Sequence, residues 1–472
     1  MKKIVLLGLL LTSAISAAEN KHYIPDGYRI ETIKTPELFH ITGLDIDKAG
    51  VVYVATRFGD VWTYRDNSWH QFASGLHEPT GLLLNDDGSV YVAQKPELTQ
   101  LVDVDHDGVA DEYINVSSGW QYHDNYHEFN FGPVKDKKGN LFGLLNLSHG
   151  DPNALAIGAM GSSGGYRGWA YKIDKKGNFS PYASGLRSPA GIGTSPKGEV
   201  FFTDNQGDWV PTSKLHLLEE GAFYGHPVSL IDYPGYDREK ITNTPVEDFE
   251  AWAEKPNVWI PHIEVANSPG NPTWDTTKGK FGPFSGQIFI GDQTQSNVFR
   301  VLLEKVKGRY QGAVINFADG FQSGNIRTAF SPTGELWVGQ TARGWSAKGN
   351  KPYGLQKLVW NGSMPFELLD IKLTKKGFRL AFTEDLHEDT IDRQSFSARE
   401  WNYKYSSNYG SPKIAEKDIP IAAVIRKNPR TLDIELALTP GKVVMINFDG
   451  IKSAAGRVPT STQVYYTLNA TR

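Results

Sequence analysis

The feature that most constrains the fold of this 472-residue chain is a short pattern that recurs along most of it. Each copy has a small or apolar start, a few polar residues, a glycine and then an alternating segment. The copies are "GLDIDKAGVVYVAT" from Gly43, "GLLLNDDGSVYVAQ" from Gly81, "FGPVKDKKGNLFGLLN" from Phe131, "GIGTSPKGEVFFTDN" from Gly191, "TAFSPTGELWVGQT" from Thr328 and a looser "GPFSGQIFIGDQ" from Gly282. Each copy predicts a strand, a tight turn and a second strand.

A hairpin of this kind cannot bury its apolar face alone, so the copies must pack on one another. Radial stacking of small sheets gives a β-propeller, which leaves only short strand edges. A flat β-sandwich array is the alternative. An aromatic content of 12% and 48 glycines agree with an all-β chain rich in turns. The longest gap between copies, from Asn205 to Gly282, predicts loops on one functional face.

The repeat pattern stops near Trp360, and a different unit follows. It contains "PFELLDIKLTKKGFRLAFTEDL" and "TLDIELALTPGKVVMINFDGI", in which strands alternate with Pro and Gly turns. This pattern predicts a small immunoglobulin-like β-sandwich. We therefore expect a propeller over residues 19–362 and a sandwich over residues 363–472. The sandwich is expected to dock on the propeller or shield its edge, without chemistry of its own.

The first residues have the form of a secretory signal peptide. Lys2 and Lys3 precede an apolar run over residues 4–11, and Ser16 and Ala18 stand where a signal peptidase requires small residues. The run is too short to span a bilayer, and no later stretch is long enough. We expect residues 1–18 to be removed and the mature protein to be periplasmic or secreted, with no membrane span.

Charge and cysteine content exclude several function classes. The chain has 49 basic and 53 acidic residues, a formal net charge of −4, so nucleic acid is not an expected partner. It has no cysteine. Disulfides, thiolate metal sites, a cysteine nucleophile and haem attachment through C-x-x-C-H are therefore excluded.

An acidic loop, "DVDHDGVADE", is the clearest metal signal in the chain. Asp103, Asp105, Asp107 and Asp111 alternate around Gly108. Hard cations such as Ca²⁺ take several oxygen ligands, and glycine permits the sharp turn that gathers them. The twelfth position is Ile114, where a calcium loop has a bidentate glutamate. We expect a structural calcium site, with a solvated acidic turn as the alternative.

Two histidines precede the third copy, in "GWQYHDNYHEFNFGP". His123, His127 and Glu128 lie where a loop is expected to meet a strand. A histidine there is suited to act as a general base, because its usual pKa lies near neutrality. The alternative is a pair of hydrogen-bonded structural histidines. His149 and Asp151, after the strand, are weaker candidates of the same kind.

Two further clusters combine cations with oxygen acceptors. Arg187 precedes the fourth copy, whose second strand is followed by Asp204, Asn205, Gln206, Gly207 and Asp208. This grouping could hold an anionic ligand with a bridging metal, or could be a structural arginine beside an acidic turn. In the last copy, Arg327 is followed by Arg343 and Trp345, with Lys348 and Lys351 nearby. These residues form either a basic, aromatic-edged pocket or a solvated loop.

Together these segments resemble a known family. The motifs "GLRSPAGI", "TDNQGDWVPTSKLHLLEEGAFYGHP", "SGQIFIGDQTQSNVFRVLLE" and "GNIRTAFSPTGELWVGQT" stand in the order found in the glucose/sorbosone dehydrogenases, also called aldose sugar dehydrogenases. The resemblance covers about residues 42–360. It implies a six-bladed propeller that holds pyrroloquinoline quinone (PQQ) with calcium.

The resemblance also implies roles for single residues. Arg187 and Arg327 would contact the quinone, and the backbone carbonyls of Gly207 and Asp208 would face the cofactor calcium. Asn205 and Arg343 would belong to the same cofactor site. The catalytic base would be His127 or His123. The chain departs from the family at three places, with Ser188 after the first arginine, Thr294 in place of a lysine, and Asn325 in place of one of two paired arginines.

Three hypotheses follow from these patterns. In the first, the protein oxidises a small sugar or alcohol with PQQ and calcium and passes electrons to a separate acceptor. In the second, it is a carbohydrate-binding or lyase-like propeller without quinone. In the third, it is a scaffold in a surface complex, with the C-terminal unit as an adaptor.

Overall fold

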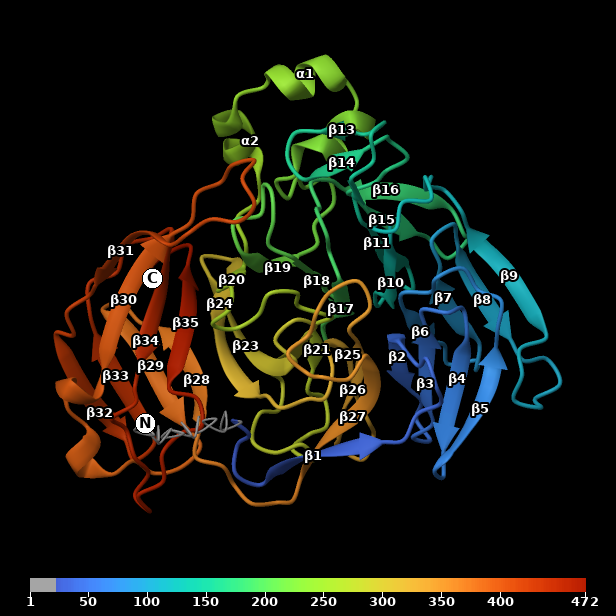
Figure 1. Ribbon diagram of the computed structural model, residues 1–472. Helices are drawn as coiled ribbons and strands as arrows, with labels where there is room; N and C mark the ends of the chain where they lie inside the picture. Colours follow the sequence, from blue (N-terminus) through green and yellow to red (C-terminus); the bar gives the residue numbers. More distant parts are fainter. Residues whose placement is uncertain (1–22) are drawn as a thin grey trace, which may run out of the picture.

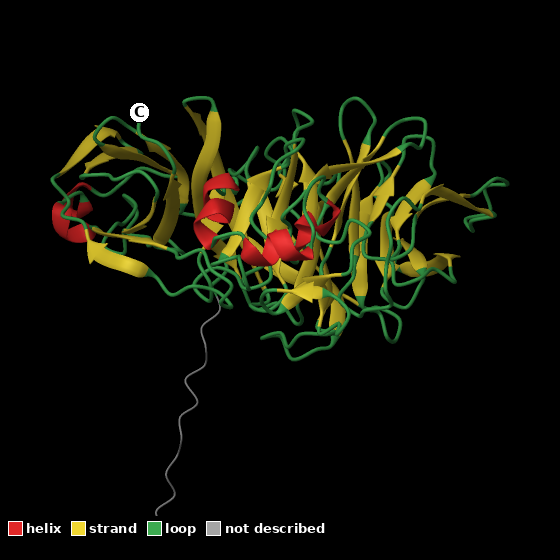
Figure 2. Cartoon of the chain, turned by 90° about the horizontal axis from the view of Figure 1, so that it is seen from above, coloured by secondary structure: helices red, strands yellow, loops and turns green. Residues whose placement is uncertain are grey.

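The computed structural model describes residues 23–472 and consists mainly of antiparallel strands (Figures 1 and 2). The predicted signal peptide lies outside the described residues. The prediction of an all-β fold is confirmed. The helices are short: α1 (Arg238–Asn243), α2 (Val246–Trp252), η1 (Pro227–Asp232), η2 (Glu388–Thr390) and η3 (Arg393–Ser395). Within residues 23–472, no helix has the length and apolar character needed to cross a bilayer.

Five of the six repeated segments turn in the same way, and the looser copy from Gly282 does not. In each of the five turns the glycine N–H donates to the carbonyl oxygen of the residue three positions earlier, at 2.8–3.1 Å. These five glycines have φ between +82° and +109°. Such values favour glycine, which lacks the Cβ that would clash. The pairs are Asp47–Gly50, Asn85–Gly88, Asp136–Gly139, Ser195–Gly198 and Ser331–Gly334.

Four sheets follow one another along the first half of the chain, each with its strands in sequence order. The first contains β2 (Ile41–Ile46), β3 (Val52–Thr56), β4 (Val61–Arg65) and β5 (Ser68–Ala73). The second contains β6 (Leu82–Leu84), β7 (Val90–Ala93), β8 (Leu98–Val102) and β9 (Glu112–Ser117). The third contains β10 (Asn130–Lys135), β11 (Leu141–Leu145), β15 (Ala170–Ile173) and β16 (Phe179–Ala183). The fourth contains β17 (Gly191–Thr194), β18 (Val200–Asp204), β19 (Ser213–Leu217) and β20 (Val258–Ile260).

Two further sheets complete the arrangement, and one of them joins distant parts of the sequence. The fifth begins with β21 (Thr273–Trp274), β22 (Ile288–Asp292), β23 (Asn297–Val306) and β24 (Arg309–Ala318). The sixth contains β25 (Asn325–Phe330), β26 (Leu336–Thr341), β27 (Tyr353–Trp360) and β1 (Tyr28–Ile33). Because β1 pairs antiparallel with β27, the N-terminal strand completes the last sheet and closes the series.

The C-terminal strands form two layers, one of which continues the fifth sheet. One layer contains β28 (Leu368–Leu373), β29 (Gly377–Phe382), β33 (Thr431–Glu435) and β32 (Ala423–Asn428). The other continues from β24 through β35 (Gln463–Leu468), β34 (Lys442–Asn447), β30 (Ser397–Asn402) and β31 (Ile414–Asp418). Leu302 and Ile315 of the fifth sheet belong to the same buried core as Phe378 and Tyr466. The two units therefore share both a sheet and a core.

Two insertions, one within the third sheet and one within the fourth, lie together at the top of Figure 1. A small sheet there contains β12 (Ser148–His149), β14 (Met160–Ser162) and β13 (Leu155–Ala156). The segment between β18 and β21 contributes η1, α1 and α2 to the same end. Trp209 and Phe249 lie in one buried cluster with Met160. The residues between β18 and β21 that line the candidate site are Asn205, Gln206, His262, Asn267 and Ser268.

Candidate functional site

A small cavity with both polar and apolar walls lies where the first strands of several sheets converge. Its wall includes Thr42 on β2, Thr80 before β6, Phe131 on β10, Ala190 before β17 and Ile326 on β25. The cavity holds about 60 Å³. We call it the inner pocket. Its other lining residues are Arg57, Tyr126, His127, Phe129, Asn146, Ser188, Asn205, Gln293, Thr341, Arg343, Gly344 and Trp345. One cavity thus combines side chains from loops that are far apart in sequence.

His127 is the titratable side chain best placed for chemistry in the inner pocket. Its Nδ1 lies 2.8 Å from the carbonyl oxygen of Leu147, which can only accept, so Nδ1 carries the proton. Its Nε2, left as the acceptor, lies 3.3 Å from the Ser188 hydroxyl. Burial lowers the pKa of His127 to about 3. The ring is therefore neutral at ordinary pH, and its Nε2 is unprotonated.

Two buried amide oxygens lie in the same cavity without a hydrogen-bond donor. Asn146 and Asn205 are 1% and 8% exposed, and the Oδ1 atom of each is unpaired among residues 23–472. A buried acceptor without a partner costs about 1–3 kcal/mol, so such a position favours a bound hydroxyl or water. The inner pocket therefore has the chemistry to accept a hydroxylated ligand.

Arg187 lies beside the pocket, held by a buried carboxylate. Its Nε donates to Asp208 Oδ1 at 2.7 Å, and the other oxygen of Asp208 lies 3.1 Å from His226 Nε2. Burial opposes ionisation of Asp208, but the charges of His226 and Arg187 hold its pKa well below the usual range. A Cβ at Gly207 would lie 1.9 Å from the Arg187 guanidinium carbon, so this approach requires glycine.

A second cavity of about 190 Å³ adjoins the first, and we call it the side pocket. It shares Ser188, Asn205 and Trp345 with the inner pocket. Its remaining lining residues are Arg187, Gln206, His262, Asn267, Ser268, Thr294, Ser346 and Tyr409. Each of the two cavities is smaller than the roughly 300–1,000 Å³ of typical ligand sites. Together they can admit only a small ligand.

The rim of the inner pocket is cationic. Arg57 and Lys95 share the carboxylate of Glu78, at 3.1 and 2.6 Å, and both lie over the ring of Phe129. Arg343 lies over the Phe58 ring and makes no ion pair with any residue of the described part of the chain. Positive charges therefore exceed negative ones at this rim, which favours an anionic or electron-rich ligand.

Arg327 lines neither the inner pocket nor the side pocket, whereas the resemblance implied that it contacts the quinone. Its Nε donates to Thr42, its Nη2 to Thr80 and its Nη1 to Ala190 and Ile326, all at backbone carbonyl oxygens 2.6–2.8 Å away. Arg327 lines a cavity at the other side of this layer, together with Gly132 and Ile192. All its nitrogens are thus committed to the backbone of several sheets, and Arg327 ties those sheets together.

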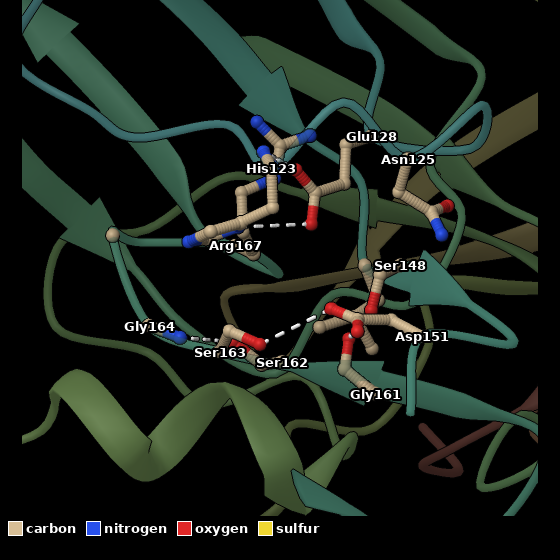
Figure 3. Close-up of polar contacts among 12 residues, drawn as sticks. His123, Asn125, Glu128, Ser148, Asp151, Gly161, Ser162, Ser163, Gly164 and Arg167 are labelled. Atoms are coloured by element: carbon tan, nitrogen blue, oxygen red, sulfur yellow. Dashed lines mark hydrogen bonds and ion pairs between the residues drawn. The ribbon is translucent and has the colours of Figure 1, made fainter. Parts of the chain in front are cut away.

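His123 is separated from His127 by its partner. The carboxylate of the fully buried Glu128 accepts from the His123 backbone N–H at 2.6 Å and lies 3.2 Å from His123 Nδ1. Figure 3 shows these two residues grouped with Arg167, apart from Asp151 and Ser163. Asp151 accepts from the Ser163 hydroxyl. These residues support the loops of the site, and His127 alone of the two histidines lines the inner pocket.

The predicted calcium loop lies in the turn between β8 and β9, away from both pockets. Oxygen atoms of Asp103, Asp105 and Asp111 lie within 4.8 Å of one another. The carboxylate of Asp107 instead accepts from the Val109 N–H, at 2.9 Å. Three of the four predicted ligands are thus brought together.

The comparisons with known proteins show the fold. Residues 64–239 match a domain of unknown function, DUF7133. No curated protein sequence matches the chain. The chain is similar to an oxidoreductase (glucose dehydrogenase) from Thermus thermophilus, with 18% identity, a TM-score of 0.52, and coverage of 71% of this chain and 100% of that one.

Two further similar structures are a PQQ-bound form and a PQQ domain of sugar dehydrogenases. One is the PQQ-bound aldose sugar dehydrogenase of Streptomyces coelicolor, at 14% identity and a TM-score of 0.50, covering 71% of this chain and 99% of that one. The other is the PQQ domain of pyranose dehydrogenase from Coprinopsis cinerea, at 12% identity and 0.52, covering 72% and 97%. The predicted resemblance to sugar dehydrogenases is confirmed for the fold.

The residues of the two pockets suit the quinone of the implied cofactor but do not suit its calcium. A planar, anionic quinone matches the guanidinium groups of Arg187 and Arg343 and the aromatic Trp345. Calcium at Gly207 does not match. The Gly207 carbonyl oxygen already accepts from the N–H groups of Val210 and Gly410, at 3.2 and 3.0 Å, which uses both of its lone pairs.

Several residues of the site carry no sequence signal. Asn146 lies in the strand end "LLNLSHG", and Tyr409 belongs to the C-terminal unit, where no chemistry is expected. Nothing in the local sequence distinguishes them from ordinary polar loop residues. Only the convergence of the loops reveals them.

Proposed function

We propose that this protein is an oxidoreductase that oxidises a hydroxyl group of a small sugar or related alcohol in the inner pocket. One observation carries the proposal: His127 is buried and neutral, with Nε2 directed to a cavity that also contains two unpaired amide oxygens. An unprotonated imidazole nitrogen can accept a hydroxyl proton, and the lowered pKa makes this one a weaker base than a histidine in water. The shared fold with sugar dehydrogenases supports the same reaction class by analogy.

The chain's own residues would act on the substrate as follows. The carbonyl oxygen of Leu147 keeps the proton on Nδ1 of His127 and orients the ring. The substrate hydroxyl would take the place beside Nε2 that the Ser188 hydroxyl borders, and its proton would pass to Nε2. Asn146 and Asn205 would accept hydrogen bonds from neighbouring hydroxyls, which positions the reacting carbon.

A quinone such as PQQ would be held at the cationic rim of the inner pocket by Arg343, beside Trp345, and would supply the acceptor for the hydride. Asn205 lies between the two pockets and would contact the substrate in both. No step is assigned to a calcium at Gly207 and Asp208, because the Gly207 carbonyl is already bonded. A separate electron acceptor belongs to the proposal, since a chain without cysteine has no C-x-x-C-H haem site.

The proposal includes an architecture and a location. The six sheets would be the blades of a six-bladed propeller over residues 19–362, and residues 363–472 would form an immunoglobulin-like sandwich that continues the fifth blade. Residues 1–18 would direct the protein to the periplasm or outside the cell. The three gathered aspartates of the β8–β9 turn would hold a structural Ca²⁺.

A non-redox, carbohydrate-binding function is the second candidate. Two observations favour it: the Gly207 carbonyl is occupied by Gly410, and the nitrogens of Arg327 are all bonded to the backbone. Two of the implied cofactor contacts are thereby removed. The same inner pocket would then bind a sugar without quinone.

Titration of the purified protein with PQQ, followed by dye reduction over a panel of sugars and alcohols, tests the proposal. We expect saturable PQQ binding and sugar-dependent dye reduction that His127→Gln lowers by about 100- to 10,000-fold. Sugar binding without any PQQ binding would overturn the redox function and support the second candidate. Absence of both would overturn both.

A further inference from the structure

The C-terminal unit reaches the candidate site through one loop. Residues 403–413, between β30 and β31, extend to the segment that follows β18. Three backbone hydrogen bonds hold the loop there. The N–H of Trp209 donates to Ser406 at 2.9 Å, that of Gly410 to Gly207 at 3.0 Å, and that of Ser411 to Pro211 at 2.8 Å. The loop therefore pairs directly with the backbone beside Arg187.

Side chains reinforce this docking. The hydroxyl of Tyr405 donates to the carbonyl oxygen of Gly225, and its ring packs 5.2 Å from the ring of Trp209. Behind the loop, β35 is hydrogen-bonded to β24, so the whole unit is anchored to the fifth sheet. A loop held at both its tip and its base is pre-organised, and a residue on it has a defined position in the site.

Tyr409 is the residue that this loop brings to the side pocket. Its ring lies 5.1 Å from the Arg187 guanidinium carbon, and the side chain lines the pocket together with Trp345. Tyr409 is nevertheless 63% exposed. A large aromatic side chain that covers a buried arginine with one face and leaves the rest open is available to a ligand.

The side pocket has the other features of a built site. Arg187, Ser188, Asn205 and Ser268 line it and are all at least nine-tenths buried. The Oδ1 atom of Asn205 has no partner among residues 23–472. Aromatic faces beside a few fixed polar groups are the composition that binds a sugar ring, because the C–H groups of a pyranose pack on aromatic faces while its hydroxyls hydrogen-bond.

We propose that Tyr409, supplied by the C-terminal unit, is a ligand-contacting residue that selects a pyranose ring in the side pocket. The proposal rests on the proposed function, since the reacting hydroxyl of that ring would reach His127 through Ser188, Asn205 and Trp345, which border both pockets. The C-terminal unit then determines specificity and is more than a shield for a sheet edge.

Calorimetric titration with a panel of methyl pyranosides, and with sorbitol as an open-chain polyol, tests this role. We expect the wild-type protein to bind a pyranoside more tightly than sorbitol. Tyr409→Ala should weaken pyranoside binding at least tenfold and leave sorbitol binding within twofold. Tyr409→Phe, which keeps the ring, should bind as the wild type does. Tyr113→Ala, at an exposed tyrosine on β9, is the matched control.

Amide hydrogen exchange over residues 403–413 shows whether the loop stays docked in each variant. If Tyr409→Ala releases the loop, Tyr409→Leu keeps an apolar side chain over Arg187 and should still lose the preference for a ring. Unchanged pyranoside affinity in a variant with a docked loop overturns the role of Tyr409 and leaves the proposed function standing. A wild-type protein that binds no sugar of the panel overturns the proposed function itself.

Discussion

The side pocket and the layer beneath the inner pocket each contain an arginine. The two arginines are almost equally buried but have different roles. Arg187 in the side pocket is 5% exposed, and Arg327 in the layer beneath the inner pocket is 6% exposed. Arg187 is held through Nε by one carboxylate, and its guanidinium borders the side pocket and the ring of Tyr409. Arg327 donates every nitrogen to backbone carbonyls of neighbouring sheets. Partners, and not burial, decide which arginine can meet a ligand.

The strongest test of this contrast removes the donors of Arg327. Arg327→Met keeps an unbranched side chain but leaves four buried carbonyl oxygens without their donor. We expect the free energy of unfolding to fall by about 4 kcal/mol. Denaturant unfolding measures this, with Arg343→Met at the exposed rim as a control that should change stability by less than about 0.5 kcal/mol. A stable Arg327→Met protein would mean that Arg327 is not a structural tie.

The next test concerns the proposed proton transfer to His127 in the inner pocket. His127→Gln should lower the turnover of the proposed oxidation by about 100- to 10,000-fold, because it removes the proton acceptor. Since the pKa of His127 is lowered to about 3, its ring stays neutral above about pH 4, and the rate should show no His127 ionisation near pH 6.5. Dye reduction between pH 5 and 8 measures both. His70→Gln, at an exposed histidine on β5, is the control, and equal losses in the two variants would contradict the assignment.

The carboxylate behind Arg187 gives a smaller effect with a defined pH dependence. Asp208→Asn should reduce the free energy of unfolding by about 3 kcal/mol at pH 7, because it leaves Arg187 without its buried partner. The folded pKa of Asp208 is depressed, so this stabilisation is complete above the unfolded value of about 3.9 and is lost as the pH falls through the folded pKa. Unfolding at pH 7 and pH 3 should therefore separate wild type and variant less at the lower pH. An unchanged gap would contradict this.

The smallest expected effect lies at the β8–β9 turn, which belongs to neither region. Calcium at 1 mM should raise the midpoint of thermal unfolding by a few degrees relative to a chelator, through preferential binding to the folded state. Asp103→Asn combined with Asp105→Asn should abolish the shift. Asp66→Asn, at an exposed aspartate, should keep it. Identical transitions with calcium and with chelator would leave an acidic turn without a metal.

Part of the site could be predicted because its signals are local. The turns of five repeated hairpins each have a glycine at a position of positive φ, and Arg187 stands next to a polar strand end within one hairpin. The choice between His127 and His123 could not be made from sequence. It depends on whether the ring meets the Leu147 carbonyl or the Glu128 carboxylate, and both partners are set by how the loops pack.

The sequence by itself determined the repeated hairpins, and with them an all-β chain, since turn chemistry and strand alternation act over a few residues. Only the tertiary structure decided that Arg327 faces backbone carbonyls, that Gly410 occupies the Gly207 carbonyl, and that Tyr409 borders the side pocket. Each of these contacts joins residues far apart along the chain. Their energies depend on which sheets become neighbours, and no local pattern of residue types encodes that.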